Sequence, residues 1–308
     1  MKLVVRTDDV GYSKVCNIGT FEVYDNGIGT SADVMLDTPG TIDALERLRN
    51  YPWVSVGWHT HFWGCPILGE DNVPTLYDHE RKGFRKDIDS DSVSFDEALR
   101  ELRAEIELCI KILGKAPDVG DIMYARDSHF GKALAQVHDE FHIVRDFMGV
   151  DLGGPMLTAK NDIYLPNEKW IDRKIFIRGL LEYCAPLKAE PRTECGFTDS
   201  IRALKNYDPI RFYVNDESRM LEKDPDTITV NAWHPGYVDW YVYACGDYSA
   251  PNYVFKDIRT VDVHALTSDE VKNWIIDNRV ELINMRDALY GTNEYQNHLK
   301  ATGSPLAV

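Results

Sequence analysis

Short β-rich runs alternate with helical patterns through the first 150 residues, and this alternation constrains the fold more than any other feature. Apolar and β-branched runs predict strands at 2–7, 30–36, 54–62, 121–125 and 142–147. Helical patterns lie between them, at 13–26, 41–49, 94–114 and 132–140. Repeated strand–helix units are typical of parallel strands with helices packed outside them. The pattern therefore predicts the α/β class, with mostly parallel strands and outer helices.

The second half of the chain is less regular. Glycines and prolines interrupt residues 150–225, where only 174–181 and 197–206 look regular. Strands are predicted again at 227–233 and 280–285, with a helix between them after a capping box of Thr267 and Glu270. No stretch is repetitive or of low complexity. We predict a single domain over residues 1–308, with loop-rich excursions at about 150–225.

The charge balance excludes two classes of partner. The chain has 34 basic and 50 acidic side chains, a formal net charge of −16, and no run of five Lys or Arg. Such a chain repels phosphate backbones and anionic membranes. Its first apolar run is too short for a signal peptide, no apolar run is long enough for a membrane span, and its six cysteines are scattered without a CxxC pair. We therefore expect a cytoplasmic protein with no nucleic-acid or membrane partner.

Carboxylates and imidazoles recur where predicted strands end. The carboxyl ends of parallel strands meet at one edge of a sheet, so these side chains are expected to lie together. They are Asp8 and Asp9, His59 and His61, Asp127 and His129, and His234 and Asp239. Mixed Asp/His donors suit Zn²⁺, Mn²⁺, Fe²⁺ or Co²⁺, and Mg²⁺ less readily. One carboxylate of the Asp8–Asp9 pair would bind such an ion, and the other would act as base toward the water that the ion activates.

Each motif also has a structural interpretation. An Asp-Asp pair after a strand often caps a helix or forms a turn. His59 and His61 lie two apart on a strand, so both could bind a metal, or one of them packs in the core. Arg145 suits either a partner for Asp8 or a structural salt bridge. The tryptophans suit either the core or the rim of a site where aromatic rings stack on sugars; they include Trp58, Trp63, Trp233 and Trp240.

Several blocks of the sequence resemble the YdjC-like carbohydrate deacetylases, which include the diacetylchitooligosaccharide deacetylases. They are RTDDVGYSKVCNIGTFEVYDNGIGTSADVM, VSVGWHTHF, PTLYDHERKGFRKD, APD, DSH, NAWHPGYVD and LTSDEVKNWIIDNRVELINMRD. The blocks span nearly the whole chain in the family's order, and residues 150–225 match least. The resemblance implies a distorted (β/α) barrel, related to the polysaccharide deacetylases, and a homodimer.

The resemblance also implies a set of site residues. One divalent ion, Mg²⁺ or Zn²⁺, would be bound by Asp9, His59 and His129, with Asp8 as general base and His234 as general acid. The family often continues its third-ligand block with further histidines, whereas Phe130, Gly131, Lys132 and Ala133 follow here. His61 lies outside the family's usual pattern and could displace or supplement a ligand.

The predicted reaction is hydrolysis of the N-acetyl group of an acetylated amino sugar or short chitooligosaccharide, with or without a phosphate, releasing acetate. The leaving amine needs a proton, and Pro235 and Gly236 break the strand after His234, which leaves that ring at the rim with a pKa near ~6.5. Two alternatives remain: metal-dependent hydrolysis of another bond in a phosphorylated disaccharide, and a non-catalytic sugar-binding regulator on the same scaffold.

Overall fold

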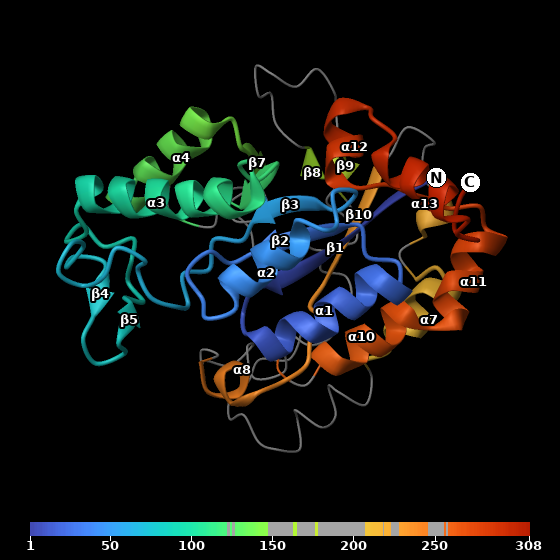
Figure 1. Ribbon diagram of the computed structural model, residues 1–308, viewed down its shortest axis with the longest axis horizontal. Helices are drawn as coiled ribbons and strands as arrows, with labels where there is room; N and C mark the ends of the chain where they lie inside the picture. Colours follow the sequence, from blue (N-terminus) through green and yellow to red (C-terminus); the bar gives the residue numbers. More distant parts are fainter. Residues whose placement is uncertain are drawn as a thin grey trace.

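A parallel sheet forms the centre of the molecule (Figure 1). The computed structural model describes residues 1–121, 124, 127–146, 163–164, 176–177, 207–217, 219–222, 228–245, 256 and 258–308. Within them, a seven-stranded sheet has the order β10-β1-β2-β3-β6-β7, and β11 also pairs with β1. Its strands are β1 (Lys2–Val10), β2 (Ser31–Val34), β3 (Ser55–Trp58), β6 (Val119–Asp121), β7 (Val144–Asp146), β10 (Ile228–Trp233) and β11 (Glu281–Leu282). Every ladder of this sheet is parallel.

Helices pack beside this sheet, and most of them contact one another in a continuous series. Contacts join α4 to α3, α3 to α2, α2 to α1, α1 to α10, and α10 to both α7 and α11. The helices are α1 (Lys14–Asn26), α2 (Thr41–Leu48), α3 (Phe95–Leu113), α4 (His129–Phe141), α7 (Pro209–Val214), α8 (Trp240–Cys245), α10 (Arg259–Thr267), α11 (Asp269–Asp277), α12 (Met285–Tyr290) and α13 (Glu294–Thr302), with a short 3-10 turn at Met220–Glu222. Short hairpins pair β4 (Tyr77–Asp78) with β5 (Gly83–Phe84), and β8 (Ile163–Tyr164) with β9 (Phe176–Ile177). The predicted α/β class is confirmed, although no ladder joins β7 to β10 in the part of the chain described.

The alternation of side chains along β1 separates two layers of the core. Leu3 and Val5 belong to a cluster with residues of α7, α10, α11 and α13. Val4 belongs to a different cluster with Val119, Val144 and Val230 from other strands. Because side chains alternate along a strand, Arg6 and Asp8 project on the same face as Val4. The sequence therefore places a cation and an anion on the face of β1 opposite the one that packs against α7, α10, α11 and α13.

Helix caps confirm several predicted boundaries. The Ser13 hydroxyl accepts the Cys16 N–H at the start of α1, and Ser94 caps α3 in the same way. The predicted cap at Thr267 is wrong, because the Ser268 hydroxyl accepts the Val271 N–H and α11 begins one residue later. Strand β6 ends at Asp121, ahead of the predicted 121–125, most of which lies outside the described residues.

Other sequence expectations have only partial outcomes. The excursion predicted at about 150–225 lies mostly outside the described residues, and the single domain stays a prediction. Cys16, Cys65 and Cys109 are free thiols. None of the described helices combines the length and apolarity that a membrane crossing requires.

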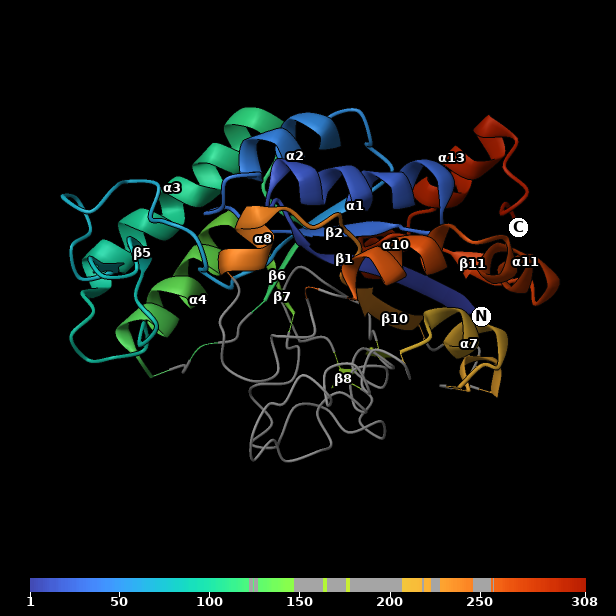
Figure 2. The same ribbon diagram turned by 90° about the horizontal axis from the view of Figure 1, so that it is seen from below.

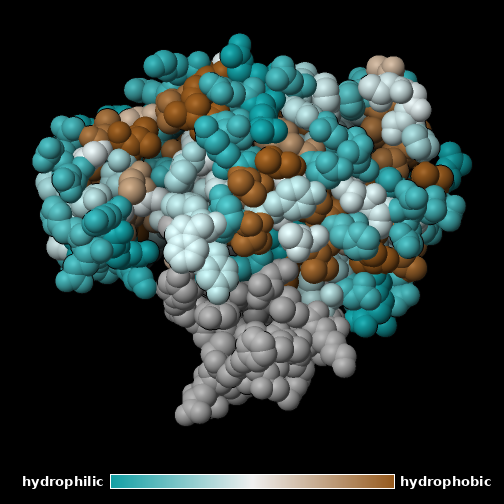
Figure 3. All heavy atoms as spheres, turned by 60° about the horizontal axis from the view of Figure 1, so that its bottom comes forward, coloured by the Kyte–Doolittle hydropathy of each residue, from teal (hydrophilic) through white to brown (hydrophobic). Residues whose placement is uncertain are grey.

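On the face drawn in Figure 3, hydrophobic side chains form small patches among hydrophilic ones. Figure 2 shows the chain ends lying toward the same end of the sheet.

Candidate active site

A β-bulge separates the two adjacent carboxylates at the end of β1. Thr7 pairs with Ala32 and Val10 with Val34, so two residues of β1 lie opposite the single residue Asp33 of β2. Asp9 has φ 60°, in the left-handed region that Asp tolerates better than most side chains. A bulge of this kind re-aims a side chain and is frequent beside active sites. The extra residue gives Asp8 and Asp9 different partners.

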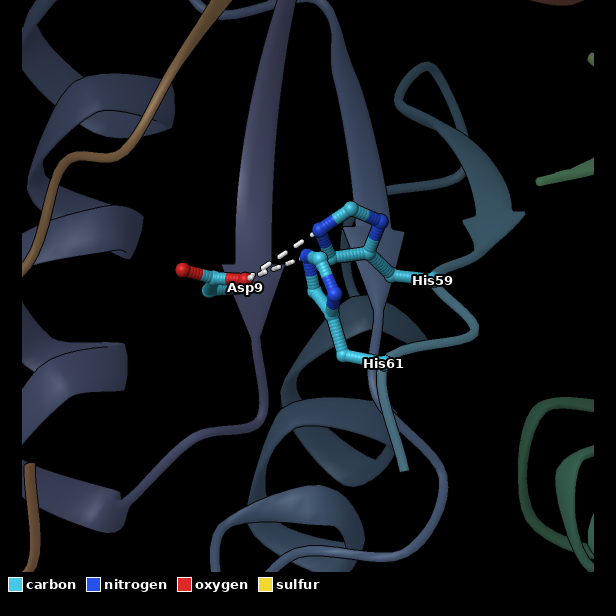
Figure 4. Close-up of side chains that lie close together, drawn as sticks. All are labelled: Asp9, His59 and His61. Atoms are coloured by element: carbon cyan, nitrogen blue, oxygen red, sulfur yellow. Dashed lines mark ion pairs between the residues drawn. The ribbon is translucent and has the colours of Figure 1, made fainter. Parts of the chain in front are cut away.

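Asp9 faces His59 and His61 (Figure 4), and it also contacts one arginine. Its Oδ1 lies 3.1 Å from His59 Nε2 and 3.7 Å from His61 Nε2. Its Oδ2 accepts a hydrogen bond from Arg259 Nη2, and the whole side chain is buried. Burial by itself raises the pKa of Asp9, but the Arg259 charge and the His59 ring hold that pKa well below its usual range. Asp9 is therefore an anion beside two imidazoles.

His59 is oriented by a second carboxylate. It follows β3 directly, and its Nδ1 hydrogen-bonds to Asp121 at the carboxyl end of β6. Burial lowers the pKa of His59, but the Asp121 charge and hydrogen bond raise it well above its ordinary value. A carboxylate on one ring nitrogen fixes the other nitrogen toward its ligand, which is the usual arrangement around a metal-binding histidine. Asp121 thus directs His59 Nε2 toward Asp9.

His61 is held against a tryptophan. Its ring stacks on Trp63 with centroids 4.2 Å apart and 14° between the planes, and it meets the His59 ring edge-on at 4.1 Å. Burial, followed by the charge of His59, lowers the pKa of His61 to about 3. A neutral imidazole in a fixed orientation is the form of histidine that binds a metal.

Asp9, His59 and His61 fit a divalent cation. Asp9 Oδ1 and His59 Nε2 are buried and form an ion pair at 3.1 Å, but neither atom has a partner among the described residues with hydrogen-bond geometry. Buried polar atoms without partners are costly, and a cation would satisfy both. Donor atoms around a tetrahedral ion with bonds of 2.0–2.2 Å lie about 3.3–3.5 Å apart, close to the separations found here. One carboxylate and two imidazoles form a donor set that suits Zn²⁺.

A second group of possible ligands contains Asp33, His59 and Asp121. The buried Arg6 guanidinium already lies beside its carboxylates, with Nη1 3.0 Å from Asp33 Oδ2 and 3.8 Å from Asp121 Oδ1. His59 also turns its Nδ1 toward Asp121. Arg6 therefore supplies the positive charge at this second group.

Asp8 is held by Arg6 through both carboxylate oxygens. Arg6 Nε donates to Oδ1 at 2.7 Å and Nη2 donates to Oδ2 at 2.9 Å, a paired geometry that fixes the carboxylate in orientation. Asp8 Oδ2 also lies 4.0 Å from His234 Nε2. Arg145, which the sequence suggested as a partner for Asp8, instead pairs with Asp139.

His234 lies where the sequence placed it, at the end of β10. Its backbone N–H donates to Asp262 Oδ2 at 2.8 Å, and the next carbonyl, of Pro235, accepts from Thr20 Oγ1 at 2.6 Å. The expected pKa near 6.5 is wrong, because burial lowers the pKa of His234 to about 4 despite the nearby anions Asp9 and Asp8. Its ring is therefore neutral at neutral pH.

The remaining candidates lie elsewhere. His129 is exposed in the first turn of α4, its Nδ1 is 2.7 Å from the Val93 carbonyl oxygen, and it belongs to neither ligand group. Asp127 is exposed, and Asp239 Oδ1 accepts the Val242 N–H at 2.9 Å. That His129 binds a metal stays a prediction.

The sequence interpretation missed three site residues. Asp121 was placed at the start of a strand, although a carboxylate at the end of a buried strand is a signal that could have found it. No sequence pattern identified Arg259 as a site residue, because it reaches Asp9 from a helix 250 positions along the chain. Asp262, one turn further along α10, contacts the His234 backbone. Helix α10 thus contacts both the Asp9 carboxylate and the His234 backbone.

The sequence model of the YdjC-like protein family matches residues 2–277. The chain belongs to the YdjC-like family. A carbohydrate deacetylase from Clostridium beijerinckii is 24% identical to it over 287 residues, which are 93% of this chain and 100% of that protein. A chitooligosaccharide deacetylase from Serratia marcescens is 28% identical over 118 residues, 37% of this chain and 46% of that protein.

The fold of this YdjC-like chain also has a solved counterpart. A protein from Enterococcus faecalis V583, described as a cellobiose-phosphate cleavage protein, superposes with a TM-score of 0.58 at 18% identity. The superposition covers 93% of this chain and 98% of the other. At that identity the likeness establishes the fold alone.

A cavity of about 650 Å³ lies away from these residues, at the amino-terminal ends of β3 and β6. Arg286, Asp118 and Glu294 line it, and Arg286 forms a salt bridge with each of the two carboxylates. None of the candidate catalytic or metal-binding residues lines that cavity. The candidate active site is thus the carboxyl-terminal edge of the sheet.

Proposed function

We propose that this YdjC-like chain hydrolyses the N-acetyl group of an acetylated amino sugar or short chitooligosaccharide and releases acetate. One observation carries the proposal: a buried carboxylate oxygen and a buried imidazole nitrogen face each other without a hydrogen bond, beside a second imidazole, at the carboxyl edge of the sheet. The curated relatives named as carbohydrate deacetylases support the choice of reaction.

Asp9, His59 and His61 would hold one divalent metal ion, with His129 as the alternative third ligand that the family resemblance implies. When bound, the ion supplies Lewis acidity toward a carbonyl oxygen and lowers the pKa of water. Asp121 keeps the His59 ring oriented, and Arg259 keeps the Asp9 carboxylate oriented and ionised. These contacts preorganise the donor atoms, so no rearrangement is needed before a ligand binds.

Asp8 and His234 would move the protons. Asp8 accepts a proton from the attacking water, and Arg6 holds its carboxylate in one orientation for that transfer. His234 delivers a proton to the leaving amine nitrogen, which is a very poor leaving group unless protonated. His234 is neutral at neutral pH and therefore first takes up a proton. Asp8, 4.0 Å away, is close enough to pass one through a bridging water.

The proposal is tested by measuring acetate release and metal content together. N-acetylglucosamine and its β-1,4-linked oligomers, each with and without a phosphate, are incubated with protein prepared with Zn²⁺, with Mg²⁺ or with a chelator. We expect acetate from at least one acetylated sugar, dependent on metal. Asp9→Asn should abolish it, whereas the exposed Asp96→Asn should not.

Other products would contradict the proposal. Release of new reducing ends from a phosphorylated disaccharide, without acetate, would identify hydrolysis of a different bond. Binding of an oligosaccharide with no bond cleavage under any metal condition would identify a sugar-binding protein.

A further inference from the structure

Helix α8 carries two exposed aromatic rings that the core does not explain. Trp240 is 78% exposed and Tyr243 is 53% exposed. The two rings stack on each other, with centroids 6.1 Å apart and planes 29° apart. Tryptophan is a largely buried residue in most proteins, so a pair of exposed neighbouring rings is a common mark of a binding surface. We call these two residues the α8 ring pair.

A series of aromatic contacts joins the α8 ring pair to the candidate metal ligands. Tyr241, the neighbour of Trp240 in the chain, lies 5.7 Å from Tyr12, centroid to centroid. Tyr12 lies 5.5 Å from Trp63, and Trp63 stacks on His61 at 4.2 Å. Figures 1 and 2 both place α8 toward the end of the sheet at which β1 ends. Helix α8 is therefore at the end of the sheet that carries the candidate site.

The chemistry of these rings selects the kind of ligand. A pyranose ring presents C–H groups on its faces, which pack on the electron-rich face of an aromatic ring, while its hydroxyl groups stay in water at the edges. Stacking of this kind does not require a charged ligand. The net charge of −16 disfavours anionic ligands, and a neutral glycan meets no such repulsion.

We propose that Trp240 and Tyr243 form a subsite for an additional sugar unit, beyond the one that carries the reacting acetyl group. This inference rests on the proposed deacetylase function and adds a preference for chain length. Oligosaccharides that reach the α8 ring pair bind more tightly than N-acetylglucosamine itself. The reacting groups are the same for every chain length, so the preference lies in KM and not in kcat.

The test compares substrates of increasing length. We expect Trp240→Ala to lower kcat/KM about tenfold or more on the N-acetylglucosamine tetramer, because the sugar unit that packs on the indole ring loses that contact. The loss should lie in KM, the shortest substrate should be unaffected, and Trp240→Phe should recover part of the loss. Tyr290→Ala, a change at an exposed tyrosine on α12, is the matched control.

A binding measurement keeps the test independent of catalysis. Titration of the wild-type protein with the fully deacetylated glucosamine tetramer and with the N-acetylglucosamine tetramer, by calorimetry, should show binding that Trp240→Ala weakens and Tyr290→Ala does not. If no sugar releases acetate, the proposed function fails, while this binding comparison still decides the subsite. The subsite is overturned if the wild type binds neither tetramer, if Trp240→Ala binds as the wild type does, or if its loss is equal for every chain length.

Discussion

At the scale of single residues, one inserted position explains how two adjacent carboxylates acquire different environments. The bulge sends Asp8 to the Arg6 guanidinium and Asp9 to His59 and Arg259. The sequence predicted that this pair divides between two roles, because two anions after a buried strand need a cation. It could not predict the bulge or Arg259, since both depend on neighbours that are remote along the chain.

The geometry favours His61 as the third metal ligand, whereas the family resemblance implies His129, and an experiment can distinguish the two. We expect His61→Ala to weaken Zn²⁺ binding by more than the 10–100-fold typical of losing an outer contact, because its Nε2 lies 3.7 Å from Asp9 Oδ1. His129→Ala should leave binding near the wild-type value. Equilibrium dialysis with elemental analysis measures both. Loss of metal in His129→Ala but not in His61→Ala would show that the resemblance, and not this geometry, identifies the ligand.

His234 gives a test of reaction class. His234→Ala should retain metal but slow hydrolysis of acetamido sugars by about 10²–10⁴, the usual contribution of a general acid. An acetyl ester with a good leaving group needs little protonation, so the same variant should lose much less rate on it. Steady-state kinetics on both substrates measure the difference. Equal losses on amide and ester would mean that His234 does not protonate the leaving group.

At the scale of helices and strands, local signals predicted two helix starts correctly and placed a third, at Thr267, one residue early. Hydroxyl residues before an amphipathic stretch correctly predicted the starts of α1 and α3. Helix α10 was not predicted, because its few apolar residues do not form a clear stripe, yet it brings Arg259 to Asp9. The identity of a helix partner is decided by packing between distant segments, which a single sequence does not reveal.

Gly19 of α1 allows this helix to approach the loop after His234. A Cβ there would lie 2.6 Å from the Tyr237 backbone nitrogen, closer than real Cβ atoms come. Alanine normally favours a helix over glycine by about 1 kcal/mol, but Gly19→Ala should destabilise the protein by roughly 1–3 kcal/mol through overpacking. Urea denaturation measures the change, and Val15→Ala, at an exposed position of α1, is the control. A stabilised Gly19→Ala protein would show that the loop after His234 can shift at little cost in free energy.

Glu101 of α3 makes stability depend on pH. Burial raises its pKa to about 7, although the Ile67 and Leu68 N–H groups donate to its carboxylate. An unfolded glutamate ionises near 4.3, so the wild type loses stability as pH rises from about 4 through 7. Glu101→Gln cannot ionise, so its stability relative to the wild type should rise by on the order of 1–3 kcal/mol over that interval.

Urea denaturation at several pH values measures this difference. Glu107→Gln, an exposed change on the same helix, is the matched control. A constant difference between Glu101→Gln and the wild type from pH 4 to 8 would contradict the assignment.

At the scale of the whole molecule, the candidate site links side chains that come from separate strands of the sheet. Asp9 lies one position before the end of β1, His59 follows β3, and Asp121 ends β6. The sequence predicted the convergence of Asp9 and His59, because parallel strands end at a common edge, but it missed Asp121. It did not predict which imidazoles would lie beside Asp9, since that depends on small differences in the positions of the loops that follow the strands.

Metal binding should therefore stabilise the entire fold. A ligand at 100 times its Kd adds about 2.7 kcal/mol to the free energy of unfolding, so Zn²⁺ should raise the Tm of the wild type by several degrees. Asp9→Asn should show little of this rise. Calorimetry with and without a chelator measures both proteins. An equal shift in Asp9→Asn would place the stabilising ion at a different site.

The position of β1 in the sheet also affects how the chain is made. It pairs with β2 on one edge, but its partner on the other edge, β10, begins at residue 228. At a synthesis rate of about 5–20 residues per second, that edge stays without its partner for roughly 10 to 40 seconds. An unpaired strand edge readily adds strands from other chains. Nascent chains that stop before β10 should thus aggregate on the ribosome unless a chaperone covers β1.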